Sequence, residues 1–323
     1  MKRREFISLL GGVAAAWPLA TRAQQPAMPV IGFLSSRSPG ESAAVVAGFR
    51  QGLKEAGYSE GRNVHIAFRW AEGRYDRLSG LAAELVEIQV AVILAAGGTQ
   101  TGFAAKAATS TIPIVNIGSD LERLGLVASL NRPGGNVTGV SLLSWPLTPK
   151  RLELLRELVP TATIIGVLVN PNAPNTELES REIQAAARAI GQQIRILSAT
   201  TEREIDAAFA SVTQHGVGAL VIGADAFFDS RRDLAVALAA QYAVPTIYGF
   251  AAPGGLISYG ASAPEGYRQA GIYVGRILKG EKPANLPVMQ SSKFEFVINL
   301  NTAKVFSLTF PPGLLAIADE VIE

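Results

Sequence analysis

Hydrophobic positions beyond residue 29 follow two alternating patterns, short β-branched runs and longer alanine-rich runs with one apolar face. Side chains repeat about every two residues in a strand and about every 3.6 residues in a helix, so these runs predict buried strands and amphipathic helices. The strands are expected at 29–34, 63–69, 89–95 and 112–117, and the helices at 41–56, 75–87 and 99–109. This alternation indicates a parallel sheet with helices on both faces.

The same order begins again after residue 162. Strands are expected at 163–169, 193–197, 218–222 and 244–248, and helices at 176–190, 202–215 and 231–242. Three apolar strand segments recur in the same order, residues 31–34 with 165–168, 91–94 with 219–222, and 112–115 with 244–247. The repetition predicts an α/β protein built of two doubly wound parallel-sheet lobes.

The last part of the chain holds too few elements for a third core. Strands are expected at 255–259 and 293–299, and helices at 264–279 and 301–305, with a terminal turn after Pro311 and Pro312. These elements must join lobes that are already built, so the chain crosses between the lobes more than once. We expect one lobe from residues 28–141 and 262–288, and the other from 142–261 and 289–323, with crossovers near 140–143, 258–262 and 288–292.

Composition supports a two-domain globular chain and excludes several classes of protein. The chain has 323 residues, of which 48% are hydrophobic and 17% charged, and such a length suggests about two domains. It has no cysteine, which excludes disulfides, thiol catalysis and lipid attachment at a cysteine. With two histidines in the whole chain, no metal and no other cofactor is expected.

The first 23 residues predict a signal peptide. Lys2, Arg3 and Arg4 precede a short apolar run at 7–16, and small residues lead to a cleavage site after Ala23. The paired arginines are similar to a twin-arginine signal. This segment carries four basic residues against one acidic residue, which leaves the remainder near −1. The near-neutral body gives no reason to expect nucleic-acid binding. We expect a periplasmic protein without a lipid anchor.

The strand-end loops are the expected ligand site. In parallel sheets, ligands bind beyond the carboxyl ends of the strands, and two such edges would face one cleft. Short hydrogen-bonding side chains, backbone amides, a few charges and a few aromatic rings gather there, in residues 35–37, 97–100, 118–120, 170–175, 223–225 and 248–250. This mixture suits a small polar or zwitterionic ligand with an apolar or aromatic part.

Structural roles for the same side chains stay open. Ser36, Thr99, Asn172 and Asn175 also suit helix N-caps, Asp120 and Asp225 suit turns or caps, and Tyr248 and Phe250 suit packing at a lobe edge. For Asp225 we expect a place at the cleft, where its carboxylate would pair with a ligand ammonium group. No nucleophile, base and orienting group stand together in the sequence, so an enzyme is not expected.

Several motifs resemble the periplasmic substrate-binding components of ABC importers, in the cluster that includes tryptophan- and tyrosine-binding members. The motifs are GLKEAGY at 52–58, EGRNV at 60–64, NRPGGNVTG at 131–139, GIYVGRILKG at 271–280, FVINLNTAK at 296–304 and ADEVI at 318–322. The resemblance covers nearly all of residues 28–323.

The resemblance implies a type I periplasmic-binding fold with three crossovers, and hinge closure on a captured ligand. It implies a monomer that serves an ABC permease of the inner membrane, with a ligand-sensing receptor of the same fold as the alternative. Contacts to the ligand would fall on the strand-end loops, which hold Ser36, Thr99, Gln100, Asp120, Asn172, Asp225 and Tyr248. An amino acid or another aromatic compound is the expected ligand.

Overall fold

Two sheets organise the chain in the computed structural model, which describes residues 28–323. The first sheet has the strand order β11-β5-β4-β3-β1-β2. Its strands are β1 (Val30–Ser35), β2 (His65–Trp70), β3 (Val92–Ala96), β4 (Ile114–Gly118), β5 (Val137–Ser141) and β11 (Met289–Gln290). The second sheet has the order β13-β12-β10-β9-β8-β6-β7. Its strands are β6 (Ile164–Val169), β7 (Gln193–Ser198), β8 (Val217–Ile222), β9 (Thr246–Tyr248), β10 (Ile257–Ala261), β12 (Phe294–Asn299) and β13 (Glu320–Ile322).

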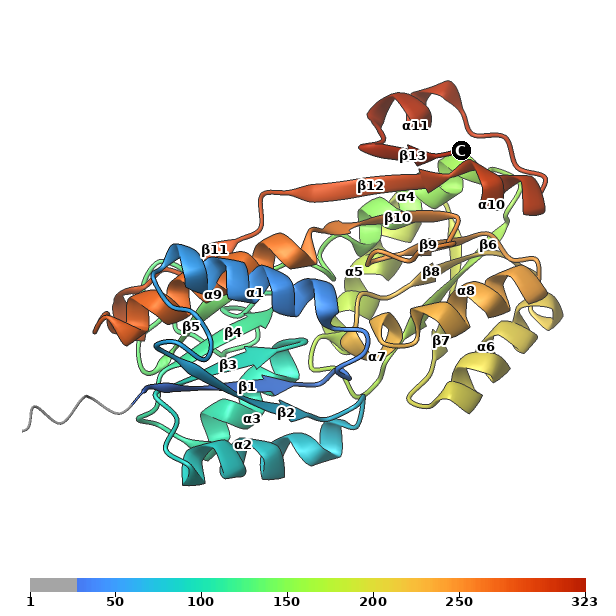
Figure 1. Ribbon diagram of the computed structural model, residues 1–323. Helices are drawn as coiled ribbons and strands as arrows, with labels where there is room; N and C mark the ends of the chain where they lie inside the picture. Colours follow the sequence, from blue (N-terminus) through green and yellow to red (C-terminus); the bar gives the residue numbers. More distant parts are fainter. Residues whose placement is uncertain (1–27) are drawn as a thin grey trace, which may run out of the picture.

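Helices cover both faces of each sheet, as Figure 1 shows. On the first sheet, α1 (Ala43–Glu55) and α9 (Ala263–Leu278) cover one face, and α2 (Leu78–Glu87) and α3 (Thr99–Ala108) the other. On the second, α4 (Thr148–Leu158) and α5 (Thr176–Ala189) lie opposite α6 (Glu202–Gln214), α7 (Ala226–Asp229) and α8 (Arg232–Gln241). The remaining short helices are η1 (Tyr75–Arg77), η2 (Pro283–Asn285), α10 (Leu300–Val305) and α11 (Pro312–Ile317).

Successive residues of each central strand enter different cores. In β1, Ile31 and Phe33 belong to the core under α1 and α9, and Leu34 belongs to the core under α2 and α3. In β8, Val221 and Ile222 divide in the same way between the two cores of the second sheet. Because both faces are buried, these strands are continuous apolar runs, which confirms the expected parallel α/β architecture. One neighbouring pair in the second sheet, β10 with β12, is antiparallel.

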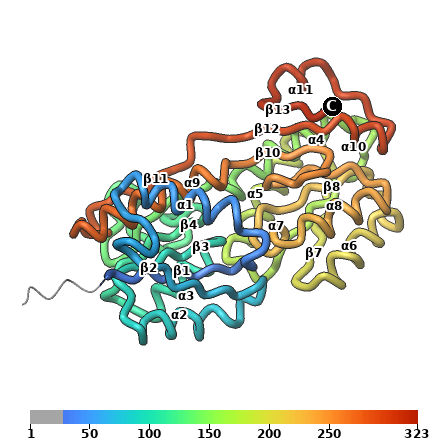
Figure 2. Tube along the Cα trace, viewed as in Figure 1, coloured from blue at the N-terminus to red at the C-terminus, as the bar shows by residue number. Residues whose placement is uncertain are grey.

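The chain passes between the two sheets three times. It leaves the first sheet after β5 for α4, returns after β10 to α9, and leaves again after β11 for β12. The tube in Figure 2 follows these passages. Residues 289 and 290 pair with β5, so the boundary that we expected at 288/289 shifts by two residues toward the C-terminus.

Several elements were absent from the sequence prediction, among them β5, α4, α11 and β13. Strand β5 occupies part of the expected crossover near 140–143, and its five residues include Gly139, which obscured the strand pattern. Helix α4 lies in a segment to which no element was assigned. The expected terminal turn contains the short helix α11 and strand β13.

Helices α1 and α9 meet along glycines, which explains two of the sequence motifs. A Cβ atom on Gly52 would overlap the backbone carbonyl oxygen of Arg268, and one on Gly271 would overlap that of Phe49. The side-chain-free positions therefore let the two backbones touch. This packing joins residues 43–55 to a helix more than 200 positions later in the chain, and it fixes the loop after β1 against the start of α9.

The helices within residues 28–323 include none that is long and apolar enough to cross a membrane. The predicted signal peptide, residues 1–23, lies outside the described residues.

Candidate functional site

A cavity of about 220 Å³ lies between the two lobes. The first lobe contributes Arg37 after β1, Gly97 to Gln100 after β3, and Ser119 after β4. The second contributes Asp225 after β8 and Phe250 after β9. The cavity therefore lies where the carboxyl ends of strands from both sheets converge. Crossover residues and the start of α9 complete the wall, including Ser144, Trp145 and Tyr267.

The glycines of the first lobe shape this wall. Gly97 and Gly98 have φ angles of +81° and +117°, a region that disfavours side chains. A Cβ on Gly97 would stand 2.5 Å from Ser36 Oγ, which donates a hydrogen bond to the Gly97 carbonyl at 2.5 Å. Ser36 thus holds the turn that delivers Thr99 and Gln100 to the cavity.

Three of the seven predicted site residues line the cavity, namely Thr99, Gln100 and Asp225. Thr99 Oγ1 accepts a hydrogen bond from Ser119 N at 3.1 Å, so it also holds two strand-end loops together. Asp225 Oδ1 accepts from Tyr75 Oη at 2.9 Å, from Asn170 Nδ2 at 2.8 Å and from Phe227 N at 3.0 Å. The last bond makes Asp225 the N-cap of α7.

The other four predicted residues, Ser36, Asp120, Asn172 and Tyr248, are not part of this cavity wall. Ser36 is buried behind Gly97, and Tyr248 is 1% exposed in the core under α8, where it packs on Phe250. Asn172 is exposed beside the loop after β6. Burial raises the pKa of Asp120, with Arg123 opposing this effect.

The polar residues of the wall that are not among the seven predicted ones include Arg37, Ser119, Trp145 and Asp229. Arg37 and Ser119 lie in strand-end loops that the sequence had marked, so position in the loop was the available signal. Trp145 comes from a crossover, and no local pattern indicates its burial. Asp229 shortly precedes α8, where it could cap the helix, but no side chain caps that helix.

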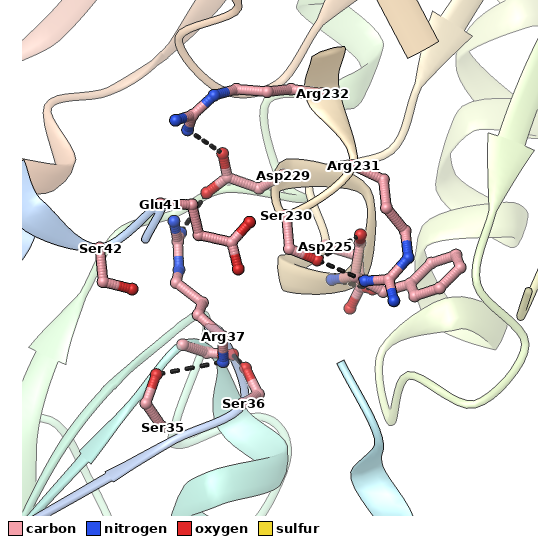
Figure 3. Close-up of polar contacts among 12 residues, drawn as sticks. Ser35, Ser36, Arg37, Glu41, Ser42, Asp225, Asp229, Ser230, Arg231 and Arg232 are labelled. Carbon is pink, nitrogen blue, oxygen red and sulfur yellow. Dashed lines mark hydrogen bonds and ion pairs between the residues drawn. The ribbon is translucent and has the colours of Figure 1, made fainter. Parts of the chain in front are cut away.

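Asp229 instead forms an ion pair across the cavity. Its carboxylate pairs with the Arg37 guanidinium of the opposite lobe, and the side chains are 9% and 10% exposed respectively. Arg232 Nη1 donates to Asp229 Oδ1 at 3.3 Å. Figure 3 shows Arg37 pointing up from the first lobe toward Asp229, with Arg232 beyond it. Burial lowers the pKa of Arg37, but Asp229, Tyr267 and Glu41 together raise it above its ordinary value, so the side chain stays a cation.

Tyr75 makes a second contact across the cleft. Its hydroxyl donates to Asp225, with 2.9 Å to Oδ1 and 3.1 Å to Oδ2. Burial raises the pKa of Asp225, while the bonds from Asn170 and Tyr75 lower it. Burial of both groups makes these contacts stronger than they would be at the surface.

Unpartnered hydrogen-bonding atoms concentrate at the cavity. Among residues 28–323, six buried side-chain nitrogen or oxygen atoms have no hydrogen-bond partner, and four of them belong to residues of this wall. The four are Arg37 Nε, Gln100 Nε2, Ser119 Oγ and Trp145 Nε1. Three can only donate, and the serine hydroxyl can donate. Such groups are costly without a partner, and hydrogen-bond acceptors of another molecule would satisfy them.

Comparisons with known proteins agree with this arrangement. The model of the family described as ABC transporter substrate binding protein matches residues 30–322. A tyrosine-binding protein of Clostridioides difficile is 29% identical over 268 residues, which cover 81% of this chain and 76% of that protein.

Two solved structures share the fold at 26% identity. A conserved domain protein from Vibrio cholerae has a TM-score of 0.84 and covers 91% of this chain and 99% of its own. An ABC domain in complex with L-Trp from Streptococcus pneumoniae has a TM-score of 0.80, with 90% and 100% covered. Two sheets joined by three crossovers, a cavity between them and a family match over almost the whole described length lead to one conclusion: this chain belongs to the ABC transporter substrate binding proteins.

Proposed function

We propose that this protein captures a small amino acid with an aromatic side chain in the cavity between its lobes and delivers it to an ABC permease in the inner membrane. The observation that carries the proposal is the group of unpartnered donors on the wall, Arg37 Nε, Gln100 Nε2, Ser119 Oγ and Trp145 Nε1. A carboxylate offers about four acceptor positions, and bonds to it are about twice as strong as bonds between neutral groups.

A zwitterion fits the charges of the two walls. Asp225 Oδ1 already accepts three hydrogen bonds, whereas Oδ2 accepts one long bond from Tyr75. Oδ2 therefore keeps capacity for the ammonium group of an amino acid, the contact that we propose for this residue. Thr99 and Gln100 are proposed contacts on the other side.

Aromatic character is supported by the rings in the wall and by the relatives. Trp145, Phe250 and Tyr267 line the cavity, and aromatic pairs add about 0.5–1.5 kcal/mol beyond the area they bury. A relative is named a tyrosine-binding protein, and a similar structure holds L-Trp. L-tryptophan and L-tyrosine are therefore the first ligands to test.

A thermal-shift titration followed by calorimetry tests the proposal. L-tryptophan or L-tyrosine at about 100 times its dissociation constant should add about 2.7 kcal/mol to the free energy of unfolding. Tryptamine lacks the carboxylate, and indole-3-propionate lacks the ammonium group, so both should bind less tightly than L-tryptophan. Absence of any shift across amino acids, sugars and organic acids would contradict solute capture.

Delivery to a permease requires export, which has its own test. Mass spectrometry of periplasmic protein should find Gln24, or its cyclised form, at the N-terminus. The twin-arginine reading further predicts that Arg3→Lys with Arg4→Lys blocks export. Full-length chain recovered only from the cytoplasm would contradict the proposed location.

A further inference from the structure

Three charged side chains alternate across the cavity. Arg37 comes from the first lobe, two residues after β1, and its guanidinium pairs with Asp229 at the end of α7 in the second lobe. Arg232, at the start of α8, pairs with the other oxygen of Asp229 at 3.3 Å. The order is cation, anion, cation, and all three side chains line the cavity (Figure 3).

Arg37 keeps N–H donors that Asp229 does not use. A guanidinium has five N–H donors in a fixed planar fork, so a partner on one edge determines the direction of the others. Asp229 Oδ2 lies at Nη2, and Nε has no partner. Neighbouring Glu41 directs its Oε1 to Ser38 N at 2.7 Å. The N–H donors of Arg37 other than the one at Asp229 are thus left for another acceptor.

We propose that Asp229 is a positioning residue for the ligand's carboxylate. From the second lobe it holds the Arg37 guanidinium so that the remaining N–H donors meet the carboxylate, and it thereby couples carboxylate binding on the first lobe to closure of the cleft. The inference rests on the proposed function, because it assigns how the carboxylate of that ligand is recognised.

The coupling has a direct electrostatic cause. The cations Arg37 and Arg232 flank the anion Asp229, Glu41 also lies near Arg37, and a carboxylate on Arg37 extends the alternation by one anion. A buried cation needs compensation, and the Asp229 contact to Arg37 exists only while the lobes meet. A ligand that binds the closed arrangement better than the open one shifts the population toward closure.

Two readouts test the proposal on the exported form of the chain. Calorimetry measures the affinities for L-tryptophan and tryptamine, which differ by the carboxylate. Interlobe distance is measured by pulsed electron spin resonance between labels on Lys54→Cys in α1 and Gln241→Cys in α8, both exposed positions. The natural chain has no cysteine, so the labels attach at these two sites.

Asp229→Asn keeps the shape and removes the charge. The expected result is an L-tryptophan affinity about tenfold lower, a tryptamine affinity that changes little, and a longer interlobe distance without ligand. Asp229→Glu should restore part of both properties. Asp233→Asn, on the exposed face of α8, is the matched control and should change neither.

A charge exchange separates the two tasks of Arg37. Arg37→Asp combined with Asp229→Arg should bring the ligand-free interlobe distance back toward that of the natural protein, while L-tryptophan affinity stays lost. The proposal is overturned if Asp229→Asn leaves both the interlobe distance and the discrimination between L-tryptophan and tryptamine as they were. If the natural protein fails to bind L-tryptophan, the proposed ligand is wrong. The distance then decides the inference: a longer one in Asp229→Asn supports the contact across the cleft, and an unchanged one refutes it.

Discussion

The two walls of the cavity use polar groups in opposite ways. On the first lobe, Gln100 Nε2 and Ser119 Oγ are buried without a partner. On the second lobe, Asn175 donates to Glu179 at 3.2 Å, and Asp225 accepts from three neighbouring groups. The first wall keeps unpartnered donors, whereas the polar groups named on the second wall are satisfied, in part by Tyr75 of the first lobe.

This difference separates the residues that hold a ligand from those that hold the lobe. Removing an unpartnered donor costs the folded protein little, and it costs the complex a bond. Removing a member of a satisfied buried network leaves its partner unpaired and destabilises the lobe itself. Variants of the first wall should therefore change affinity, and variants beneath the second wall should change stability.

The largest expected effect lies under the second wall, at Glu179. Burial raises its pKa to about 7, although the hydrogen bond from Thr148 and the charge of Arg151 both lower it. The folded state therefore binds the proton more tightly than the unfolded state, whose value is 4.5. Stability should fall as pH rises from the lower value through the upper one, by about 3 kcal/mol at most.

Denaturant unfolding at several pH values checks this dependence. Glu179→Gln should flatten the fall in stability between the two pKa values, with L-tryptophan affinity changed less than about threefold. An equal pH dependence in the glutamine variant would assign the effect to other groups.

The next effect concerns the frame of the first wall. Gly52→Ala places a methyl group against the Arg268 carbonyl oxygen, so it should destabilise the protein by about 1–3 kcal/mol. Gly80→Ala is the matched control, because Gly80 is exposed in α2 with open space around it, and it should stabilise by about 0.5–1 kcal/mol. Melting curves of both variants check the pair; equal shifts would show that α1 and α9 separate freely.

Asp225 tests the capacity that remains on the second wall. Asp225→Asn should lower affinity for L-tryptophan about tenfold, because the ammonium loses its counter-charge. Indole-3-propionate has no ammonium group, so its affinity should change by no more than about threefold. Calorimetry with both compounds gives the answer. Equal losses of affinity for the two compounds would instead indicate that Asp225 acts by accepting the hydrogen bond of Tyr75 across the cleft.

The smallest expected effect is at Gln100, on the first wall. Gln100→Ala should weaken L-tryptophan binding about fivefold, the loss of one hydrogen bond, with an unchanged melting point. Asn175 lines the same cavity from the second lobe. Asn175→Ala should have the opposite effect, a lower melting point with a nearly unchanged affinity for L-tryptophan. The contrast fails if both variants change the same quantity.

The sequence by itself determined most of the elements and the architecture. Continuous β-branched strands such as 92–96 and amphipathic helices such as 202–214 are local patterns, and burial on both faces leaves a parallel sheet as their common solution. The repeated strand order revealed two lobes, and the family motifs identified the relatives. The strand-end rule brought Thr99, Gln100 and Asp225 to the cavity.

Only the tertiary structure decided which polar side chains are in use. Ser36 and Tyr248 stand at the carboxyl ends of strands, near the same sheet edges as Gln100 at the start of α3, but packing turns them into the protein interior. Arg37 and Asp229 are 192 residues apart, and the crossovers that bring them together depend on contacts such as that of α1 with α9. Whether a donor has a hydrogen-bond partner depends on residues far away in the sequence. A periodic pattern of hydrophobic positions does not specify those residues.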